Sequence, residues 1–274
     1  MAALGAPPES LWLAAATSPH AVLMLDYDGT LAPFQDDPAQ AFPYAGVEPL
    51  LQDIAALHRD RLILISGRRL DDLEGLVSLP RTVECWGSHG RERRLPDGSR
   101  EMMLIPATAA AVLDTAGTWR ALIESAGGIF ERKPTSIAFH WRALDIDARS
   151  RIRTQLASRL AGIDGADGLF WHEFDGGMEL RVTGVDKGTA VRQVLTETRS
   201  SSSHAHGALL AYLGDDMTDE DAFRALGDEG FSILVRDQLR PTAAESWLRP
   251  PGELLRFLER WLDLRSRDTG RSSS

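Results

Sequence analysis

Short apolar runs that end abruptly in polar residues constrain this chain more than any other feature. The run at residues 21–25 (AVLML) stops at Asp26, and the run at 209–213 (LLAYL) stops at Gly214 and Asp215. Continuous apolar runs of this length predict strands buried on both faces, as in parallel sheets. We expect strands at residues 21–25, 62–65, 82–86, 209–213 and 231–235.

Helical patterns separate these runs. Alternation of strand and helix predicts an α/β fold with a doubly wound, Rossmann-like parallel sheet. In such sheets ligands bind beyond the carboxyl ends of the strands, so polar residues there are the first candidates for chemistry. The expected helices span residues 47–58, 70–77, 187–198 and 219–226.

The alternation breaks between about residues 105 and 183. This stretch reads helix, strand, strand, helix, strand, strand, an αββαββ unit that we interpret as an inserted α+β cap domain with an antiparallel sheet. Its helices are expected at 107–126 and 146–160, and its strands at 129–133, 136–142, 169–174 and 178–182. The expected core then comprises residues 1–104 and 184–264, the cap 105–183, and a disordered tail 265–274.

Composition excludes several classes of partner. The chain has 274 residues, 43% of them hydrophobic, which suits a large core domain plus a smaller one. Its net charge of −10 argues against a nucleic-acid partner. A single cysteine, Cys85, cannot form an intrachain disulfide, and no signal peptide or membrane-spanning stretch is apparent. We therefore expect a soluble, cytoplasmic monomer with a small-molecule substrate and no membrane partner.

Two carboxylates follow the first predicted strand, in the segment Asp26-Tyr27-Asp28-Gly29-Thr30. At that position Asp26 can attack phosphorus while Asp28 handles the proton of the leaving group. The competing interpretation is a pair of turn or capping aspartates. The preceding apolar run and the following Gly-Thr-Leu favour catalysis.

Two further segments suit a phosphate group. The segment Ser66-Gly67-Arg68 follows the second strand, where a hydroxyl and backbone N–H groups can hold phosphate oxygens, although Ser-Gly is also an ordinary loop and helix cap. Lys187 opens the helix after the cap, where it can neutralise a phosphate or a nucleophilic carboxylate. A surface lysine is the competing interpretation, but helix starts disfavour cations.

An acidic cluster follows the fourth predicted strand, in the segment Gly214-Asp215-Asp216-Met217-Thr218-Asp219-Glu220. Carboxylate oxygens at a strand end suit a hard cation, above all Mg²⁺. Asp219 and Glu220 also fit a capping role in a first helical turn, whereas Asp215 does not.

The order of these segments resembles the haloacid-dehalogenase-like (HAD) superfamily of phosphotransferases. This resemblance implies that Asp26 forms an aspartyl phosphate, that Asp28 is the general acid and base, and that Ser66 and Lys187 hold the phosphate. It also implies Mg²⁺ bound by the Asp26 side chain, the Asp28 main-chain carbonyl and Asp215, with Asp216 and Asp219 nearby.

Longer stretches resemble the trehalose-6-phosphate phosphatase family over nearly all of residues 21–260. They are LDYDGTLAPF, ISGRRLDDL, GSHGRERRLPDG, ERKPTSIAFHWR, MELRVTGVDKG and GDDMTDEDAF. The resemblance implies hydrolysis of trehalose 6-phosphate within trehalose biosynthesis. It implies substrate contacts at His89, Gly90, Glu92, Glu131, Lys133, His140, Arg142 and Glu179.

Other interpretations stay open at this point. The charged cap residues could be a solvated strand face, and Glu179 with Arg181 a surface ion pair of little energetic value. Related capped phosphatases act on sucrose, mannosylglycerate or glucosylglycerate phosphates. A phosphomutase or a non-enzymatic receiver-like domain would use similar residues, although Asp28 and the cap argue against a receiver.

Overall fold

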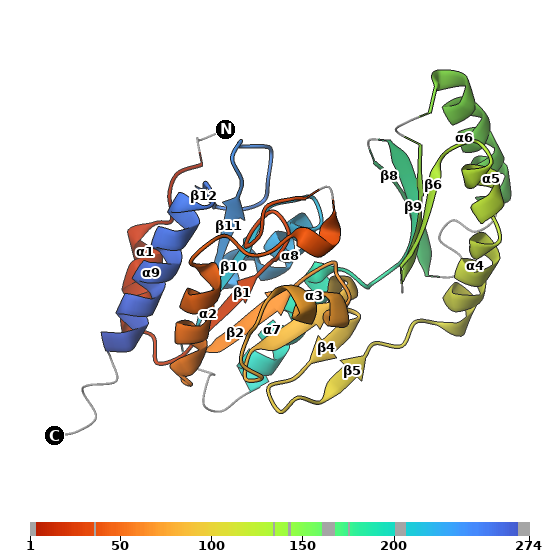
Figure 1. The fold of residues 1–274 in the computed structure, drawn as a ribbon. Helices are drawn as coiled ribbons and strands as arrows, with labels where there is room; N and C mark the ends of the chain where they lie inside the picture. Colours follow the sequence, from red (N-terminus) through yellow and green to blue (C-terminus); the bar gives the residue numbers. More distant parts are fainter. Residues whose placement is uncertain are drawn as a thin grey trace. The chain divides into compact units, whose positions relative to one another are not determined.

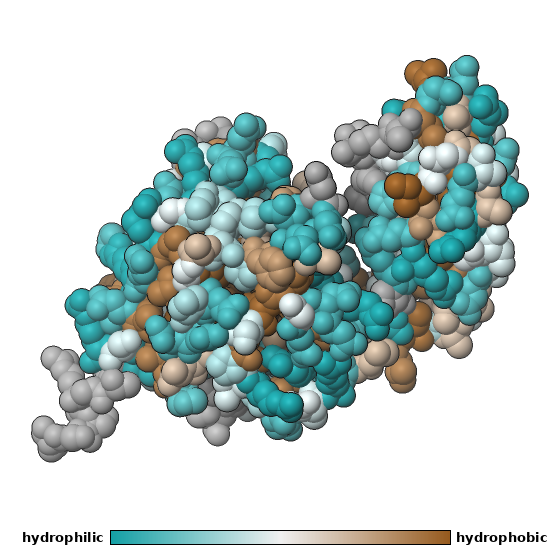
Figure 2. Space-filling view, in the orientation of Figure 1, coloured by the Kyte–Doolittle hydropathy of each residue, from teal (hydrophilic) through white to brown (hydrophobic). Residues whose placement is uncertain are grey.

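The computed structural model describes residues 4–35, 37–133, 135–141, 144–160, 168–174, 176–200 and 207–267. The chain divides into two compact units, one formed by Met1–Met102 with Asp186–Ser274 and the other by Met103–Val185. The sequence placed these divisions at 104/105 and 183/184. Hydrophilic residues cover most of the visible surface of each unit (Figure 2).

The first unit, called the core unit below, is built on an eight-stranded sheet in the order β12-β11-β10-β1-β2-β3-β4-β5. Neighbours from β12 to β3 are parallel, and β4 and β5 extend the sheet as antiparallel strands. The strands are β1 Ala21–Leu25, β2 Arg61–Ile65, β3 Glu84–Gly87, β4 Glu92–Arg94, β5 Arg100–Met102, β10 Leu209–Gly214, β11 Phe231–Val235 and β12 Ser246–Leu248.

Helices cover both faces of this sheet (Figure 1). Leu23 and Leu25 of β1 pack with α1, α2, α3 and α9 on one face, while Val22 and Met24 pack with α7 and α8 on the other. The predicted doubly wound α/β arrangement is confirmed. The helices are α1 Glu9–Thr17, α2 Val47–Ala56, α3 Leu70–Leu76, α7 Lys187–Ser200, α8 Asp219–Leu226 and α9 Gly252–Ser266, with 3-10 turns at Pro38–Gln40, Ser88–Gly90 and Gly227–Glu229.

The second unit, called the cap unit below, has a four-stranded antiparallel sheet in the order β6-β7-β9-β8. Its helices pack on one face of this sheet around Phe139, Leu180 and Leu156 (Figure 1). The strands are β6 Ile129–Lys133, β7 Ser136–His140, β8 Leu169–Phe174 and β9 Gly177–Val182, and the helices are α4 Ala107–Gly117, α5 Arg120–Glu124 and α6 Ile146–Leu160.

The structure corrects two expectations. The single helix predicted at 107–126 is broken, because Thr118 and Trp119 bond to residues three positions earlier and tighten the turn after Gly117. Residue 265 does not begin a disordered tail. Arg265 belongs to α9, is fully buried, and pairs with Asp60 near β2.

No helix among the described ranges is both long and apolar enough to cross a membrane.

Candidate active site

The register of the parallel strands brings several predicted residues to one edge of the core sheet. Leu25, the last residue of β1, pairs with Leu213 of β10 and with Leu64 of β2. Asp26 continues this register by donating its backbone N–H to the Leu213 carbonyl at 2.8 Å. The segments after β1, β2 and β10 therefore begin side by side.

Lys187 joins two of the predicted acidic residues. Its Nζ lies 2.6 Å from Oδ1 of Asp26 and 2.8 Å from Oδ1 of Asp219, and only 3% of its side chain is exposed. Thr30 donates a further hydrogen bond to the other oxygen of Asp26 at 3.1 Å. Lys187 is therefore a buried counter-ion of the predicted nucleophile, and the surface-lysine interpretation is wrong.

Asp219 is the hub of the acidic segment. Besides Lys187, its Oδ1 accepts the hydroxyl of Tyr212 at 2.6 Å, and its Oδ2 accepts the backbone N–H groups of Asp215 and Asp216 at 3.0 Å each. Both oxygens are thus already engaged by protein groups.

Asp215 differs from Asp219 in this respect. Its Oδ1 is buried and has no hydrogen-bond partner among the described residues. Gly29, with a φ of +80°, lies so close that an added Cβ would stand 2.2 Å from Oδ2 of Asp215. One oxygen from each of Asp26, Asp215 and Asp219 lies within 4.8 Å of the others. An unpartnered buried oxygen beside the Asp26 carboxylate suits a cation with oxygen ligands.

The electrostatics of this cluster point the same way. Burial and the neighbouring Asp219 raise the pKa of Asp26 to about 8 despite Lys187, and burial with Asp26 raises the pKa of Asp215 to about 10. The pKa of Asp219 is raised as well, chiefly by burial. When all three carboxylates are ionised, their charge exceeds that of Lys187 and of Arg236, which lies 3.9 Å from Asp215, and a bound divalent cation would offset the excess. The residues present therefore fit a metal ion.

Asp216 has a different environment from its neighbour. Its Oδ1 accepts both the backbone N–H and the hydroxyl of Thr218, at 2.7 and 2.6 Å. Burial opposes ionisation, but Lys187 and these bonds lower the pKa of Asp216 to about 2. Asp216 therefore stays ionised and caps the turn that leads into α8.

Asp28 pairs with Arg68, a contact that the sequence analysis did not predict. Arg68 donates from Nε and Nη2 to the two carboxylate oxygens of Asp28, at 2.7 Å each. The Arg68 guanidinium also lies 5.8 Å from the ring centroid of Tyr27. This pairing could not be read from spacing, because 40 residues separate the two partners.

Ser66 and Gly67 lie where the sequence placed them, directly after β2. Ser66 is fully buried, and its Oγ accepts the backbone N–H of Arg68 at 3.1 Å. This bond leaves the hydroxyl proton able to point elsewhere. An added Cβ at Gly67 would stand 2.6 Å from Cε1 of His89, whose φ is +57°. The turn that carries His89 therefore packs directly on the Ser66-Gly67 loop.

The structure gives Gly90 and Glu92 contacts within the core unit. Glu92 accepts the Ser88 hydroxyl at 2.7 Å and the backbone N–H of Leu70, the first residue of α3, at 3.1 Å. Gly90, with a φ of +103°, lies close to the Asp186 carbonyl just before Lys187. These contacts shape the turn that carries His89.

The predicted substrate residues of the cap unit share one sheet face, opposite the helices. Glu131, Ala138 and Glu179 are cross-strand partners in one row, and Lys133, Ser136 and Arg181 form the next. His140 belongs to the same face and bonds to Glu131 at 3.0 Å. Arg142, predicted with them, lies outside the described residues.

Glu179 is the centre of this face. It is 3% exposed and accepts bonds from Ser136 at 2.6 Å, Arg181 at 2.6 Å and Lys133 at 3.4 Å. Burial alone would raise its pKa, but Lys133 and Arg181 outweigh burial and lower the pKa to about 2. The expected surface ion pair with Arg181 is in fact part of a partly buried network that keeps Glu179 ionised.

Sequence reasoning missed Tyr212 as a site residue, and it named Arg68 in the Ser66-Gly67-Arg68 segment without giving it a role. Arg68 stood within the quoted ISGRR segment, directly after Ser66 and Gly67, so its position was the available signal. Tyr212 was counted only as part of the apolar strand, although a tyrosine inside a buried run needs a partner for its hydroxyl.

The chain is similar to several known proteins. Residues 24–248 match the family described as trehalose-phosphatase. A trehalose-phosphate phosphatase of Mycobacterium marinum is 36% identical over 250 residues, which cover 89% of this chain and 62% of that protein. The chain thus spans less than two thirds of the length of that relative.

Solved structures share the fold. A trehalose-6-phosphate phosphatase of Aspergillus fumigatus has a TM-score of 0.72 at 24% identity, covering 95% of this chain and 99% of its own. A haloacid dehalogenase-like hydrolase of Bacteroides thetaiotaomicron has a TM-score of 0.62 at 13% identity, covering 88% of this chain and 99% of its own. With the family match over residues 24–248, this chain belongs to the trehalose-phosphatase family.

Proposed function

We propose that this chain is a Mg²⁺-dependent phosphatase that hydrolyses trehalose 6-phosphate to trehalose and phosphate through an aspartyl phosphate on Asp26. One observation carries the chemistry: the Asp26 carboxylate is buried at the end of β1, held by Lys187 and beside the unpartnered oxygen of Asp215. Family membership supports the substrate.

The residues divide the reaction between them. An oxygen of Asp26 forms a bond to phosphorus as the bond from phosphorus to the sugar oxygen breaks, and Asp28 gives that oxygen its proton. Asp28 then takes a proton from water as the water oxygen attacks phosphorus and releases Asp26. Attack of one anion on another is repulsive, and Lys187, 2.6 Å from Asp26, reduces that cost.

Asp26, Asp215 and the main-chain carbonyl of Asp28 would hold Mg²⁺, which when bound supplies positive charge that stabilises the phosphoryl group during transfer. Asp219 cannot easily serve as a ligand, because both its oxygens already accept two hydrogen bonds each. Together with Asp216 it fixes the segment that carries Asp215. Ser66, Gly67 and Lys187 would bind the phosphate oxygens, since the Ser66 hydroxyl proton is not used in its bond to Arg68.

The charged face of the cap unit is proposed to bind the sugar. Sugars present hydroxyl groups, which ionised and preorganised partners bind well. Glu131, Lys133, His140, Arg142 and Glu179 would make these contacts. His89, Gly90 and Glu92 of the core unit are proposed as further substrate-binding residues. Residues 105–183 would then serve as the inserted cap domain of a core formed by residues 1–104 and 184–264.

A phosphate-release screen over sugar phosphates tests this function. Trehalose 6-phosphate is compared with sucrose, mannosylglycerate and glucosylglycerate phosphates, with Mg²⁺ and after chelation. We expect many turnovers on trehalose 6-phosphate only with Mg²⁺. Preference for another sugar phosphate would contradict the assignment of trehalose 6-phosphate as the substrate. Release of at most about one phosphate per chain would contradict the assignment of the chain as an enzyme. We also propose that the enzyme is cytoplasmic, which cell fractionation tests. We propose that it is a monomer, which light scattering tests.

A further inference from the structure

Two arginines follow β11, the strand beside β10 in the core sheet. Arg240 donates to the main-chain carbonyl of Asp215 from Nε and Nη2, at 3.3 Å each, and from Nη2 to the carbonyl of Asp216 at 2.6 Å. Arg236 approaches the same Asp215 carbonyl at 3.4 Å. The loop after β11 thus contacts the backbone of the acidic segment as well as its carboxylates, since Nη1 of Arg236 also lies 3.9 Å from Oδ2 of Asp215.

Asp219 binds the N–H groups of the same backbone segment. Its Oδ2 accepts the N–H groups of Asp215 and Asp216 at 3.0 Å each. The peptide group that links these two residues therefore has its N–H on Asp219 and its C=O on Arg240. A peptide group is planar and stiff, so hydrogen bonds to both its N–H and its C=O fix its orientation. They also fix the direction in which the Asp215 side chain leaves the backbone.

Arg240 is itself held in place. Its Nη1 lies 2.5 Å from Oε1 of Glu220, and Oε2 of Glu220 accepts the Ala243 backbone N–H at 2.7 Å. Only 15% of the Arg240 side chain and 3% of the Glu220 side chain are exposed. A largely shielded guanidinium that is held by several partners at once has little freedom to move, which suits a fixed support.

We propose that Arg240 is a positioning residue for the metal site: with Asp219 it clamps the Asp215–Asp216 peptide so that the Asp215 carboxylate points toward Asp26. This inference rests on the proposed metal-dependent function. Groups that orient metal ligands typically change metal affinity by 10- to 100-fold when they are removed. Arg240→Met should therefore weaken Mg²⁺ binding by about tenfold or more.

A purely structural role makes a different prediction. If Arg240 only ties two loops together, Arg240→Met lowers the melting temperature by the same amount with and without Mg²⁺. If Arg240 positions Asp215, the rise in melting temperature caused by Mg²⁺ also requires more metal, since a ligand stabilises the folded state according to its affinity for that state.

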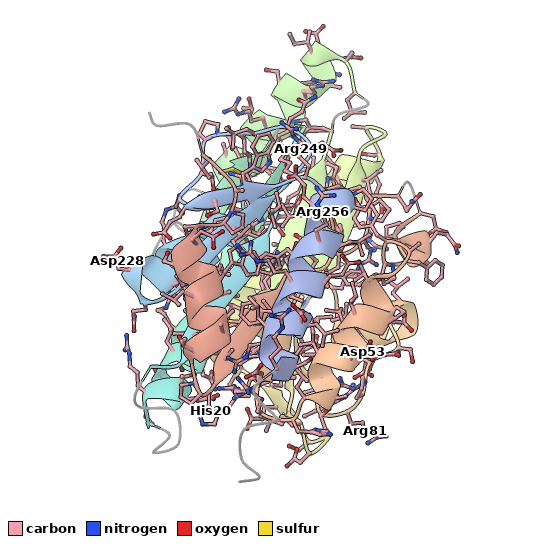
Figure 3. The ribbon with its side chains drawn as sticks, turned by 90° about the vertical axis from the view of Figure 1, so that its left-hand side faces the viewer. His20, Asp53, Arg81, Asp228, Arg249 and Arg256 are labelled. Carbon is pink, nitrogen blue, oxygen red and sulfur yellow. The ribbon has the colours of Figure 1, made fainter. Side chains whose placement is uncertain are left out.

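The experiment is a Mg²⁺ titration of the full chain after chelation, read as melting temperature and, separately, as phosphate release. Arg240→Met is compared with Arg240→Lys, which keeps the charge but can donate to fewer acceptors in this geometry. The control is Arg256→Met, which removes the same charge from an exposed position on α9 (Figure 3).

We expect the half-saturating Mg²⁺ concentration to rise about tenfold or more for Arg240→Met, less for Arg240→Lys, and not at all for Arg256→Met. An unchanged half-saturating concentration in Arg240→Met, whatever its melting temperature, would overturn the inference. A wild-type chain that shows no response to Mg²⁺ in either readout would instead overturn the metal-dependent function itself.

Discussion

Arg68 donates a hydrogen bond to each carboxylate oxygen of Asp28, from Nε to Oδ2 and from Nη2 to Oδ1, at 2.7 Å each. In this pairing both oxygens act as hydrogen-bond acceptors. Asp28 must free one of them before it can pass a proton to a leaving sugar oxygen. The resting structure therefore holds the proposed general acid in a fixed place near Asp26 but does not yet show it in its proton-donating arrangement.

Arg68→Met should lower turnover of trehalose 6-phosphate by about tenfold to a hundredfold, because proton transfer by a misplaced acid loses much of its benefit. Hydrolysis of p-nitrophenyl phosphate should fall far less, since nitrophenolate leaves without a proton. Steady-state kinetics on both substrates check this. Arg69→Met, which removes the exposed neighbouring charge, is the control. Equal losses on both substrates would assign Arg68 to the fold rather than to Asp28.

Glu179→Ala should reduce kcat/KM for trehalose 6-phosphate by about tenfold to a hundredfold, because it removes the ionised centre of the charged face of the cap unit. p-Nitrophenyl phosphate has no sugar to bind, so its hydrolysis should change little. Glu173→Ala is a matched control, since Glu173 is half exposed on a neighbouring strand and pairs only with Arg153 among the described contacts. A similar loss on both substrates would point to a structural role for Glu179.

The pH dependence of this effect follows from the surroundings of Glu179. Lys133, Arg181 and Ser136 lower the pKa of Glu179 to about 2, so its charged form is present above that pH and is lost only as the pH falls through about 2. The ratio of wild-type to Glu179→Ala kcat/KM should therefore stay constant from about pH 5 to pH 8. A ratio that collapses on acidification within this window would contradict the assigned charge state.

Chelation should abolish activity, and Mg²⁺ should restore it better than Zn²⁺. The proposed ligands, Asp26, Asp215 and the main-chain carbonyl of Asp28, are all oxygens, which suit a hard cation. Phosphate release after dialysis against a chelator, followed by addition of each metal, measures this. Full activity in the chelated protein would rule out the metal requirement.

Arg265→Met should destabilise the core unit by about 3–5 kcal/mol, because it removes the main counter-ion of a buried carboxylate. Asp60 would keep the Ala21 backbone N–H at 2.9 Å and the more distant Arg59 at 3.8 Å. Arg265 is fully buried and donates to Asp60 at 2.6 and 2.8 Å and to the carbonyls of Ala15 and Ser18. Urea unfolding at neutral pH gives the difference. Arg267→Met, at an exposed position two residues after Arg265, should stay within about 0.5 kcal/mol of wild type.

The sequence predicted those elements whose residues carry a local signal. The strand at 21–25 forms at the predicted residues. A strand buried on both faces is a continuous apolar run, which can be identified in the sequence without knowing which strands it pairs with. β5 (REM) is exposed and has no apolar run, so nothing local marked it. Its place comes from pairing with β4.

The same distinction applies to the site. Asp26, Ser66, Lys187 and Asp215 stand at element ends, where the fold class directs attention. Arg68 and Arg240 act through partners 40 and 24 or 25 residues away, and such pairings depend on how loops after different strands meet. Arg265 contacts Asp60 across 205 residues, so no local pattern showed that residue 265 belongs to the core unit.

The most direct test of the central claim is a search for phosphoryl transfer to Asp26. The chain is mixed with trehalose 6-phosphate and Mg²⁺, quenched in acid during turnover, digested and analysed by mass spectrometry. We predict a phosphoryl group on the peptide that contains Asp26, and neither this adduct nor phosphate release in a folded Asp26→Asn variant, because removing a covalent nucleophile costs several orders of magnitude in rate. Phosphate release by the wild type without the adduct, together with activity of Asp26→Asn above about a hundredth of wild type, would contradict the account.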